Sequence, residues 1–313
     1  MRLRFYCIIF LVMLHWPGRS FAHDDVTVLL SEEGGVYAEF ATQLRAALPP
    51  SGSAGAPLRV LTLASFRDAD FSRTGPGHLV VAVGAPAMAA IAHKPPGLPV
   101  LNVLVSRNSF RSLVRSGGRA ADSRLFSAIY FDQPWARQFA LIRYSIPGRR
   151  GGILLGKESA ELMTPLQAAA RDAHMTAHIE LISDEADLLP ALKRLLATSD
   201  ALLAVPDSAI YNRTNIAPIL LTSYRAKVPL FGFSASYVKA GALAAVYSQP
   251  GQIAQQVAEI IQSQRGNGGL PVPQSPRYFS VGVNPQVRLS LELTMDDEPQ
   301  LLQKLQQLPV PTP

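Results

Sequence analysis

Short hydrophobic runs alternate with helical patterns along the first part of the chain. The runs at 26–30, 58–63, 78–83 and 99–105 predict strands. Between them, 36–48 and 87–93 carry apolar residues at helical spacing. Continuous apolar strands that alternate with helices are typical of a parallel sheet covered on both faces.

The same rhythm starts again after residues 127–130. Helices are expected at 134–144, 159–173, 187–197 and 252–264, with strands between and after them at 152–156, 176–181, 201–205, 228–233, 242–247 and 278–283. Two successive β/α series predict an α/β protein of two Rossmann-like, doubly wound lobes. The length of 313 residues agrees with about two domains, and 48% apolar residues exclude a disordered chain.

The first residues have the pattern of a secretory leader. Arg2 and Arg4 precede an apolar run at 5–14, and residues 20–22 (SFA) supply a cleavage signal after Ala22. We therefore expect residues 1–22 to be a cleaved signal peptide and the protein to be periplasmic. Cleavage removes Cys7 and three arginines, which lowers the formal charge from +6 to +3 and argues against nucleic acid as a partner.

Catalytic and metal-binding patterns are absent from the sequence. Neither phosphate-binding glycine motif occurs. The nearest approach to a nucleophile elbow, at 232–236 (GFSAS), lacks the final glycine. His174 and His178 are four residues apart, but a third metal ligand is not evident. We expect no enzyme activity, no metal and no cofactor.

Polar and aromatic residues at the ends of strands are the remaining candidates, because ligands of doubly wound sheets bind beyond the carboxyl ends of the strands. Hydroxyls and helix-start amides can hold a carboxylate, an aspartate an ammonium, and aromatic rings a flat apolar group. Each residue alone is compatible with a purely structural role, and Glu32 with a solvated loop. The candidate ligand-binding residues are Ser31, Glu32, Gly84, Ala85, Ser106, Tyr130, Gln133, Asp207, Ser208, Tyr211, Phe233, Ser234 and Tyr247.

Three arginines follow the strand at 99–105. Arg107, Arg111 and Arg115 are spaced to share one face of a helix. The spacing fits either a solvated face or a surface for an anionic partner.

Several segments, in order along the chain, resemble the ABC-transporter substrate-binding proteins that include tryptophan and other aromatic-amino-acid binders. They are 80–86 (VVAVGAP), 98–100 (LPV), 146–155 (IPGRRGGILL), 200–208 (DALLAVPDS), 227–232 (KVPLFG), 238–244 (VKAGALA) and 283–284 (VN). The resemblance implies the type I periplasmic binding fold, a monomer that closes on a small molecule, and a membrane permease as partner.

The resemblance also implies three crossovers between the lobes, which we place near 127–130, 233–235 and 280–283. Lobe 1 would comprise 24–128 plus 234–281, and lobe 2 would comprise 129–233 plus 282–313. Gly84, Ser106 and the Ser31 loop would line one wall of the cleft. Asp207, Ser208 and Tyr211 would line the other.

Three positions depart from the family pattern. Ala85 stands where a hydroxyl residue is usual, Arg107 replaces an acidic residue, and 211–213 (YNR) replaces a simple Ser/Thr pattern. The ligand could therefore be a free amino acid or a more anionic solute.

Solute delivery to an ABC transporter is the main functional hypothesis. A sensory module that signals to a membrane receptor or kinase would use the same cleft. An exported hydrolase would require a Ser–His–acid arrangement around Ser234.

Overall fold

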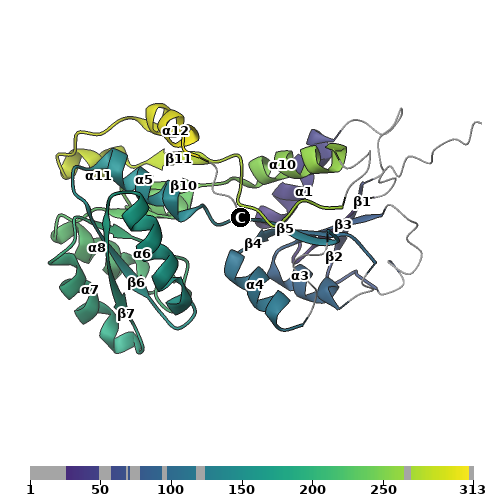
Figure 1. Ribbon diagram of the computed structural model, residues 1–313, viewed down its shortest axis with the longest axis horizontal. Coiled ribbons are helices and arrows are strands. Elements are labelled where there is room, and N and C mark those ends of the chain that lie inside the picture. The colour runs from purple at the N-terminus through teal and green to yellow at the C-terminus, as the bar shows by residue number, and fades with distance from the viewer. Residues whose placement is uncertain are drawn as a thin grey trace, which may run out of the picture.

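The computed structural model describes residues 26–48, 58–67, 70, 78–93, 97–117, 124–263 and 269–309. They form two lobes, each built on a sheet covered by helices (Figure 1). The expected two-lobed α/β architecture is thereby confirmed. The expected signal peptide, with Cys7 and Ala22, lies outside the described residues.

The first lobe contains a parallel sheet of order β2-β1-β3-β4-β5. Its strands are β1 (Val26–Leu30), β2 (Leu58–Thr62), β3 (Leu79–Val83), β4 (Val100–Val105) and β5 (Phe126–Tyr130). Its helices are α1 (Gly35–Ala47), α3 (Ala85–Ala92), α4 (Arg107–Arg115) and α10 (Pro250–Ser263). Alternate strand residues point to opposite faces: Val28 belongs to the core under α1 and α10, and Leu29 to the core under α3 and α4.

The second lobe contains a sheet of order β11-β10-β9-β8-β6-β7, parallel except for β11. Its strands are β6 (Arg150–Leu155), β7 (Thr176–Leu181), β8 (Ala201–Leu203), β9 (Leu230–Gly232), β10 (Ala244–Tyr247) and β11 (Ser280–Val283). Its helices are α5 (Trp135–Ser145), η1 (Ala160–Leu162), α6 (Met163–Asp172), η2 (Glu185–Asp187), α7 (Leu188–Leu196), α8 (Ile216–Arg225), α9 (Ala235–Ala240), α11 (Pro285–Ser290) and α12 (Glu298–Gln306).

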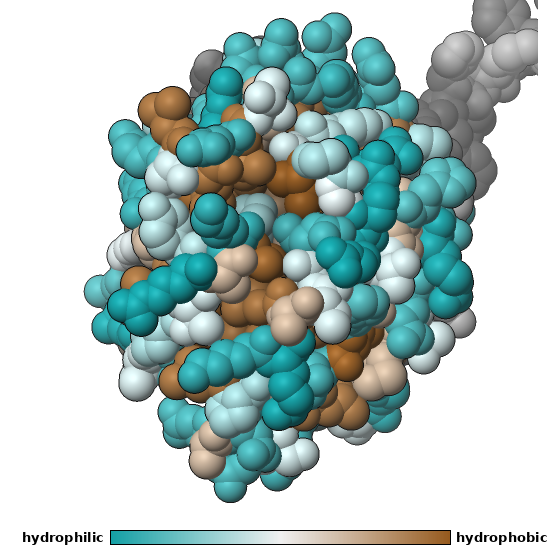
Figure 2. Space-filling view, turned by 90° about the vertical axis from the view of Figure 1, so that its left-hand side faces the viewer, coloured by the Kyte–Doolittle hydropathy of each residue, from teal (hydrophilic) through white to brown (hydrophobic). Residues whose placement is uncertain are grey.

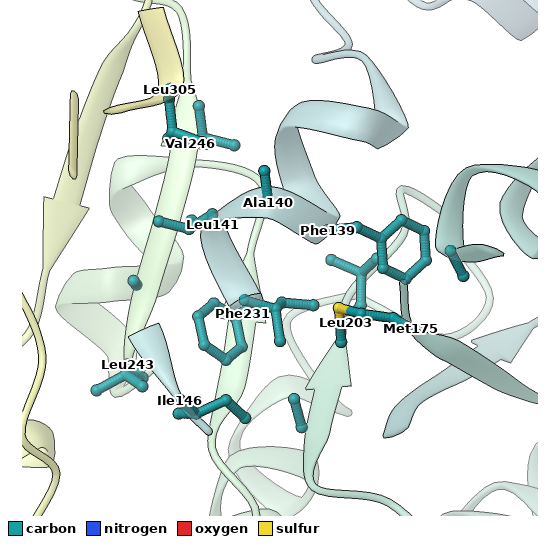
Figure 3. Packing of buried hydrophobic residues seen from close by; sticks show 14 of the residues in the cluster. Phe139, Ala140, Leu141, Ile146, Met175, Leu203, Phe231, Leu243, Val246 and Leu305 are labelled. Carbon is teal, nitrogen blue, oxygen red and sulfur yellow. The ribbon is translucent and has the colours of Figure 1, made fainter. Parts of the chain in front are cut away.

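Two hydrophobic cores hold the second sheet between its helices. Phe139 of α5, Leu203 of β8 and Met175 meet in the first of them (Figure 3). Leu154 and Leu202 point to the other face, where α7 and α8 pack. Because both faces are covered, inner strands such as β3, β8 and β9 are buried as their apolar runs predict, whereas the edge strands β2 and β7 are only partly buried.

Three crossovers connect the lobes, and two of them differ from the expected positions. The first follows β5, close to the expected 127–130. The expected return to the first lobe at 233–235 is wrong, because β10 pairs with β9 in the second sheet. The chain returns only after β10, where α10 begins and packs beside α1 (Figure 1).

The third crossover lies before β11 and not within 280–283, since β11 itself pairs with β10. Residues leading to it run along β5 of the first lobe, where the backbone N–H of Gln274 donates to the carbonyl of Ala128 and that of Tyr130 to the carbonyl of Gln274. Residues 234–247 and 280–281 therefore belong with the second sheet, contrary to the expected lobe boundaries.

The outer end of the second lobe faces the viewer in Figure 2, where hydrophobic residues gather near the centre between hydrophilic ones. Partly exposed apolar side chains on this lobe are Leu181, Leu189, Leu221, Tyr224 and Leu289. In the described part of the chain, no helix combines the length and the apolar character needed to span a membrane.

Candidate functional site

A cleft of about 1120 Å³ lies between the two lobes. The first lobe contributes residues of α3 and α4, the second contributes the loop after β6 with η1 and α6, and the first crossover contributes 132–136. Both lobes thus meet at the carboxyl ends of their strands, which is where a doubly wound sheet offers a ligand site.

Ser106 forms the start of the helical wall on the first lobe. Its Oγ accepts a hydrogen bond from the backbone N–H of Ser109 at 2.9 Å and caps α4. A serine directly after a strand and before a helical pattern is thus used here as an N-cap. Ser106 lines the cleft, as expected, along with Ala85 and Gln133.

Arg107, Arg111 and Arg115 all line the cleft. Arg111 and Arg115 remain exposed to solvent there, so the solvated face that their spacing allowed also faces the cleft. Arg115 forms an ion pair of 3.5 Å with Glu161 across the cleft. Arg107 donates to the Ser275 Oγ at 2.9 Å, and its guanidinium carbon lies 4.8 Å from the centre of the Tyr130 ring.

Tyr130 and Asp132 lie beneath Arg107. Tyr130 is only 4% exposed and packs edge-on against Phe110, and it lies outside the residues that line the cleft. Burial raises the pKa of Tyr130 and lowers the pKa of Arg107. Asp132 accepts a hydrogen bond of 2.5 Å from the backbone N–H of Arg107, and burial raises the pKa of Asp132 to about 6.

Gln133 uses both ends of its side-chain amide within the crossovers. Its Nε2 donates to the Ser248 Oγ at 2.9 Å, and its Oε1 accepts from Arg137 at 2.5 Å. Arg137 also donates to the Pro276 carbonyl at 3.3 Å, and burial lowers its pKa to about 10. Gln133 therefore links the segments on which the lobes would pivot.

Ser31 and Gly84 lie together at the ends of β1 and β3, outside the residues that line the cleft. The Ser31 Oγ donates to the Val83 carbonyl at 2.7 Å and accepts from the backbone N–H of Ala87 at 3.1 Å. A Cβ on Gly84 would lie 2.5 Å from that Oγ. The pair therefore closes the turn into α3, while Glu32 is exposed to solvent.

Asp207 is buried and also lies outside the cleft lining. Its carboxylate accepts from the Ser159 hydroxyl at 2.6 Å and from the backbone N–H groups of Gly156 and Ala209, each at 3.1 Å. It joins the loops that follow β6 and β8. Ser208 donates from its Oγ to Glu158 at 2.9 Å.

Three of the remaining expected residues form no part of the cleft wall. Tyr211 and Phe233 pack with Tyr237 in an aromatic cluster, and burial raises the pKa of Tyr211. Tyr247, at the end of β10, is half-buried, and burial raises its pKa.

Ser234 also lies outside the cleft wall, and the described structure does not place a histidine and an acid beside it. Its hydroxyl lies 2.7 Å from that of Ser236. His178 lies in β7 and contacts the Thr198 hydroxyl at 3.2 Å. Within the described ranges, no group of three or more His, Cys, Asp or Glu side chains is placed to hold a metal ion.

Several cleft residues were missed from the sequence. They are Met88, Asp132, Trp135, Lys157, Glu158 and Glu161. Lys157 and Glu158 directly follow Gly156, the first residue after strand β6. The criterion that selected Ser106, a polar residue just after a strand, would therefore have selected them too. Asp132 and Trp135 flank Gln133, which the sequence did single out.

The family model of ABC transporter substrate binding proteins matches residues 78–298 of the chain. None of the curated proteins matches it. An ABC domain from Streptococcus pneumoniae in complex with L-Trp has a similar structure, with a TM-score of 0.59, 16% identity, and coverage of 89% of this chain and 97% of that one.

Two further structures share the fold at low identity. A ligand-free, open substrate-binding protein with adhesive properties from Clostridium difficile has a TM-score of 0.67 and 12% identity, covering 88% of this chain and 96% of its own. A conserved domain protein from Vibrio cholerae has a TM-score of 0.56 and 19% identity, with coverage of 90% and 98%. These likenesses support the type I periplasmic binding fold.

Proposed function

Since the chain belongs to the family of ABC transporter substrate-binding proteins, we propose that it captures a small organic solute and delivers it to the permease of an ABC transporter. The ligand is amino-acid-like or related to an amino acid. The similar S. pneumoniae structure holds L-Trp, a molecule with a carboxylate and a flat apolar body. This family is one of binding proteins and not of enzymes.

The cleft between the lobes is the observation that carries this proposal. It is lined from both sides, and contacts such as Arg115 with Glu161 join its two walls. A ligand that touches both walls favours the closed arrangement, because it binds that arrangement more tightly than the open one.

Export to the periplasm is part of the proposal. The basic start and apolar run of the leader support it, and so does the family. A periplasmic monomer would meet its solute outside the cytoplasm and present a closed shape to the permease.

A thermal-shift screen of the purified protein against amino acids, purines, sugars and organic acids tests solute capture. A ligand at 100 times its Kd should stabilise the protein by about 2.7 kcal/mol. Ala89 lines the cleft on α3, so Ala89→Trp should abolish the shift by placing an indole where the ligand would contact this wall. Ala46 is an exposed alanine of α1 outside the cleft, and Ala46→Trp serves as the matched control.

Uptake separates transport from sensing. Cells that lack the protein should lose uptake of the identified solute, and the native chain should restore it while Ala89→Trp does not. Unchanged uptake would favour the sensory alternative. A panel in which no solute shifts the midpoint would overturn solute capture itself.

A further inference from the structure

We propose that the solute is an organic anion, with a carboxylate, an apolar body and no ammonium group, and that Arg111 and Lys157 bind its carboxylate from opposite lobes. This inference rests on the proposed function and names the class of its ligand.

Arg111 and Lys157 are cations of the cleft that lack a partner among the described residues. Arg111 lies on α4 and Lys157 on the loop after β6, and both line the cleft. Neither side chain forms a hydrogen bond or an ion pair with any described residue, whereas the side chains of Arg107 and Arg115 both do. One unpaired cation on each wall suits an anion that draws the lobes together.

The carboxylates of the cleft already have donors. Glu158 accepts from the Ser208 backbone N–H at 3.2 Å and from its hydroxyl at 2.9 Å, and Glu161 pairs with Arg115. Asp132 accepts from the backbone N–H of Arg107. A ligand ammonium would share carboxylates that already accept from protein donors, while a ligand carboxylate meets two cations whose side chains have no partner among the described residues.

The charge balance of the lining agrees with this. Four cationic side chains, Arg107, Arg111, Arg115 and Lys157, stand against the three carboxylates. Charge-assisted hydrogen bonds between guanidinium and carboxylate are among the strongest polar contacts in proteins. The cleft therefore favours a net negative ligand.

Apolar side chains line another part of the wall, beside polar ones such as Asn108, Ser112 and Gln133. Met88 and Leu113 come from the first lobe, Trp135 from the start of α5, and Leu162, Pro165 and Ala169 from the second lobe. Together they can cover a hydrocarbon or aromatic body, since an apolar lining with a few placed polar groups is typical of small-molecule sites. The class is thus an aryl- or alkyl-substituted carboxylic acid.

Isothermal titration with four compounds of one carbon skeleton tests the charge preference. They are 3-phenylpropionate, L-phenylalanine, 3-phenylpropan-1-ol and 3-phenylpropan-1-amine, and hexanoate with L-norleucine provides an aliphatic pair. We expect the carboxylate without ammonium to bind at least about 10-fold more tightly than the others, because it alone combines hydrogen bonds to the two cations with the absence of a positive charge.

Variants test the two cations. Arg111→Gln and Lys157→Gln should each weaken 3-phenylpropionate binding by roughly 10- to 100-fold, and Arg111→Lys should retain part of the affinity. Arg225 of α8 is exposed and is not one of the residues that line the cleft, so Arg225→Gln should leave the affinity unchanged. Unaltered melting midpoints of the unliganded variants confirm that folding is intact.

Three results would overturn the inference. They are amino acids binding as tightly as the acids, both Gln variants keeping native affinity, or none of the six compounds binding. If a neutral or zwitterionic solute of the wider panel binds and Ala89→Trp abolishes its binding, the ligand class is wrong and the binding function stands. If nothing in either set binds, both fail.

Discussion

The Nε2 of Gln133 lies 2.9 Å from the Oγ of Ser248, so a hydrogen bond joins the first crossover to the second. The Ser248 hydroxyl in turn donates to the carbonyl of Tyr278 at 2.6 Å, in the third crossover. All three connections between the lobes therefore meet at one hydroxyl.

Ser248→Ala should destabilise the protein. It removes an acceptor from Gln133 and a donor from Tyr278, and an unsatisfied buried polar group costs about 1–3 kcal/mol. The free energy of unfolding, measured by urea titration, should fall by that amount. Ser290→Ala removes an exposed hydroxyl of α11 and should change it by less than about 0.5 kcal/mol. Equal effects of the two variants would contradict a linking role for Ser248.

Gly84→Ala should be strongly unfavourable. Gly84 has φ 92° and ψ 161°, a region that only glycine adopts easily, and a Cβ would lie 2.5 Å from the Ser31 Oγ and 2.8 Å from the Tyr37 ring. We expect a loss of about 2–4 kcal/mol in the free energy of unfolding. Gly97→Ala has open space around its Cβ and should cost nothing or stabilise slightly. If Gly84→Ala lowered the free energy of unfolding only slightly, the turn would have to rearrange to accept the Cβ.

Asp207→Ala should act on stability more than on binding. The variant leaves the Ser159 hydroxyl and the N–H groups of Gly156 and Ala209 without their acceptor. The free energy of unfolding should fall by roughly 2–4 kcal/mol. Asp172 is exposed on α6, and Asp172→Ala is the control with a change below about 0.5 kcal/mol. Unchanged stability with lost ligand affinity would instead make Asp207 a ligand contact.

Asp132→Asn should change how stability depends on pH. Burial raises the pKa of Asp132 in the folded protein from 3.8 to about 6, so the folded state binds the proton more tightly than the unfolded state. The contribution of Asp132 to stability therefore falls as pH rises from about 4 to 6 and is constant above that. The free energy of unfolding of Asp132→Asn relative to the native chain should rise over this range, by at most about 3 kcal/mol.

Chemical denaturation at pH 4, 5, 6 and 7 measures this difference. Asparagine can still accept the hydrogen bond from Arg107, so the variant tests the charge and not the bond. A difference that stays constant from pH 4 to 7 would contradict the raised pKa.

The strands and helices could be predicted because burial on both faces leaves a local signature. The five apolar residues of β3, for example, are fully buried. Lobe membership could not be predicted in the same way. The residues of β10 would be equally apolar in either sheet, and only their pairing with β9, a contact distant in sequence, decides between the two.

For the site residues, the sequence could predict that they lie at strand ends but not that they face the cleft. A polar side chain at a strand end has backbone groups within reach, and Ser31 and Asp207 bind those groups instead of facing the cleft. Their sequence positions are the same in kind as that of Ser106, which does line the cleft. Only the three-dimensional path of the neighbouring loops distinguishes them.

The position of α10 beside α1 bears on the order in which the chain can fold during synthesis. Residues 26–130 emerge first and contain every strand of the first sheet, yet α10, which covers one of its faces, begins only at Pro250. The strands β6 to β10 are synthesised before α10, and the second sheet remains incomplete until β11 follows it. Neither lobe can bury its core fully until α10 or β11 has been made, so the nascent chain exposes apolar surface while residues 131–249 are synthesised.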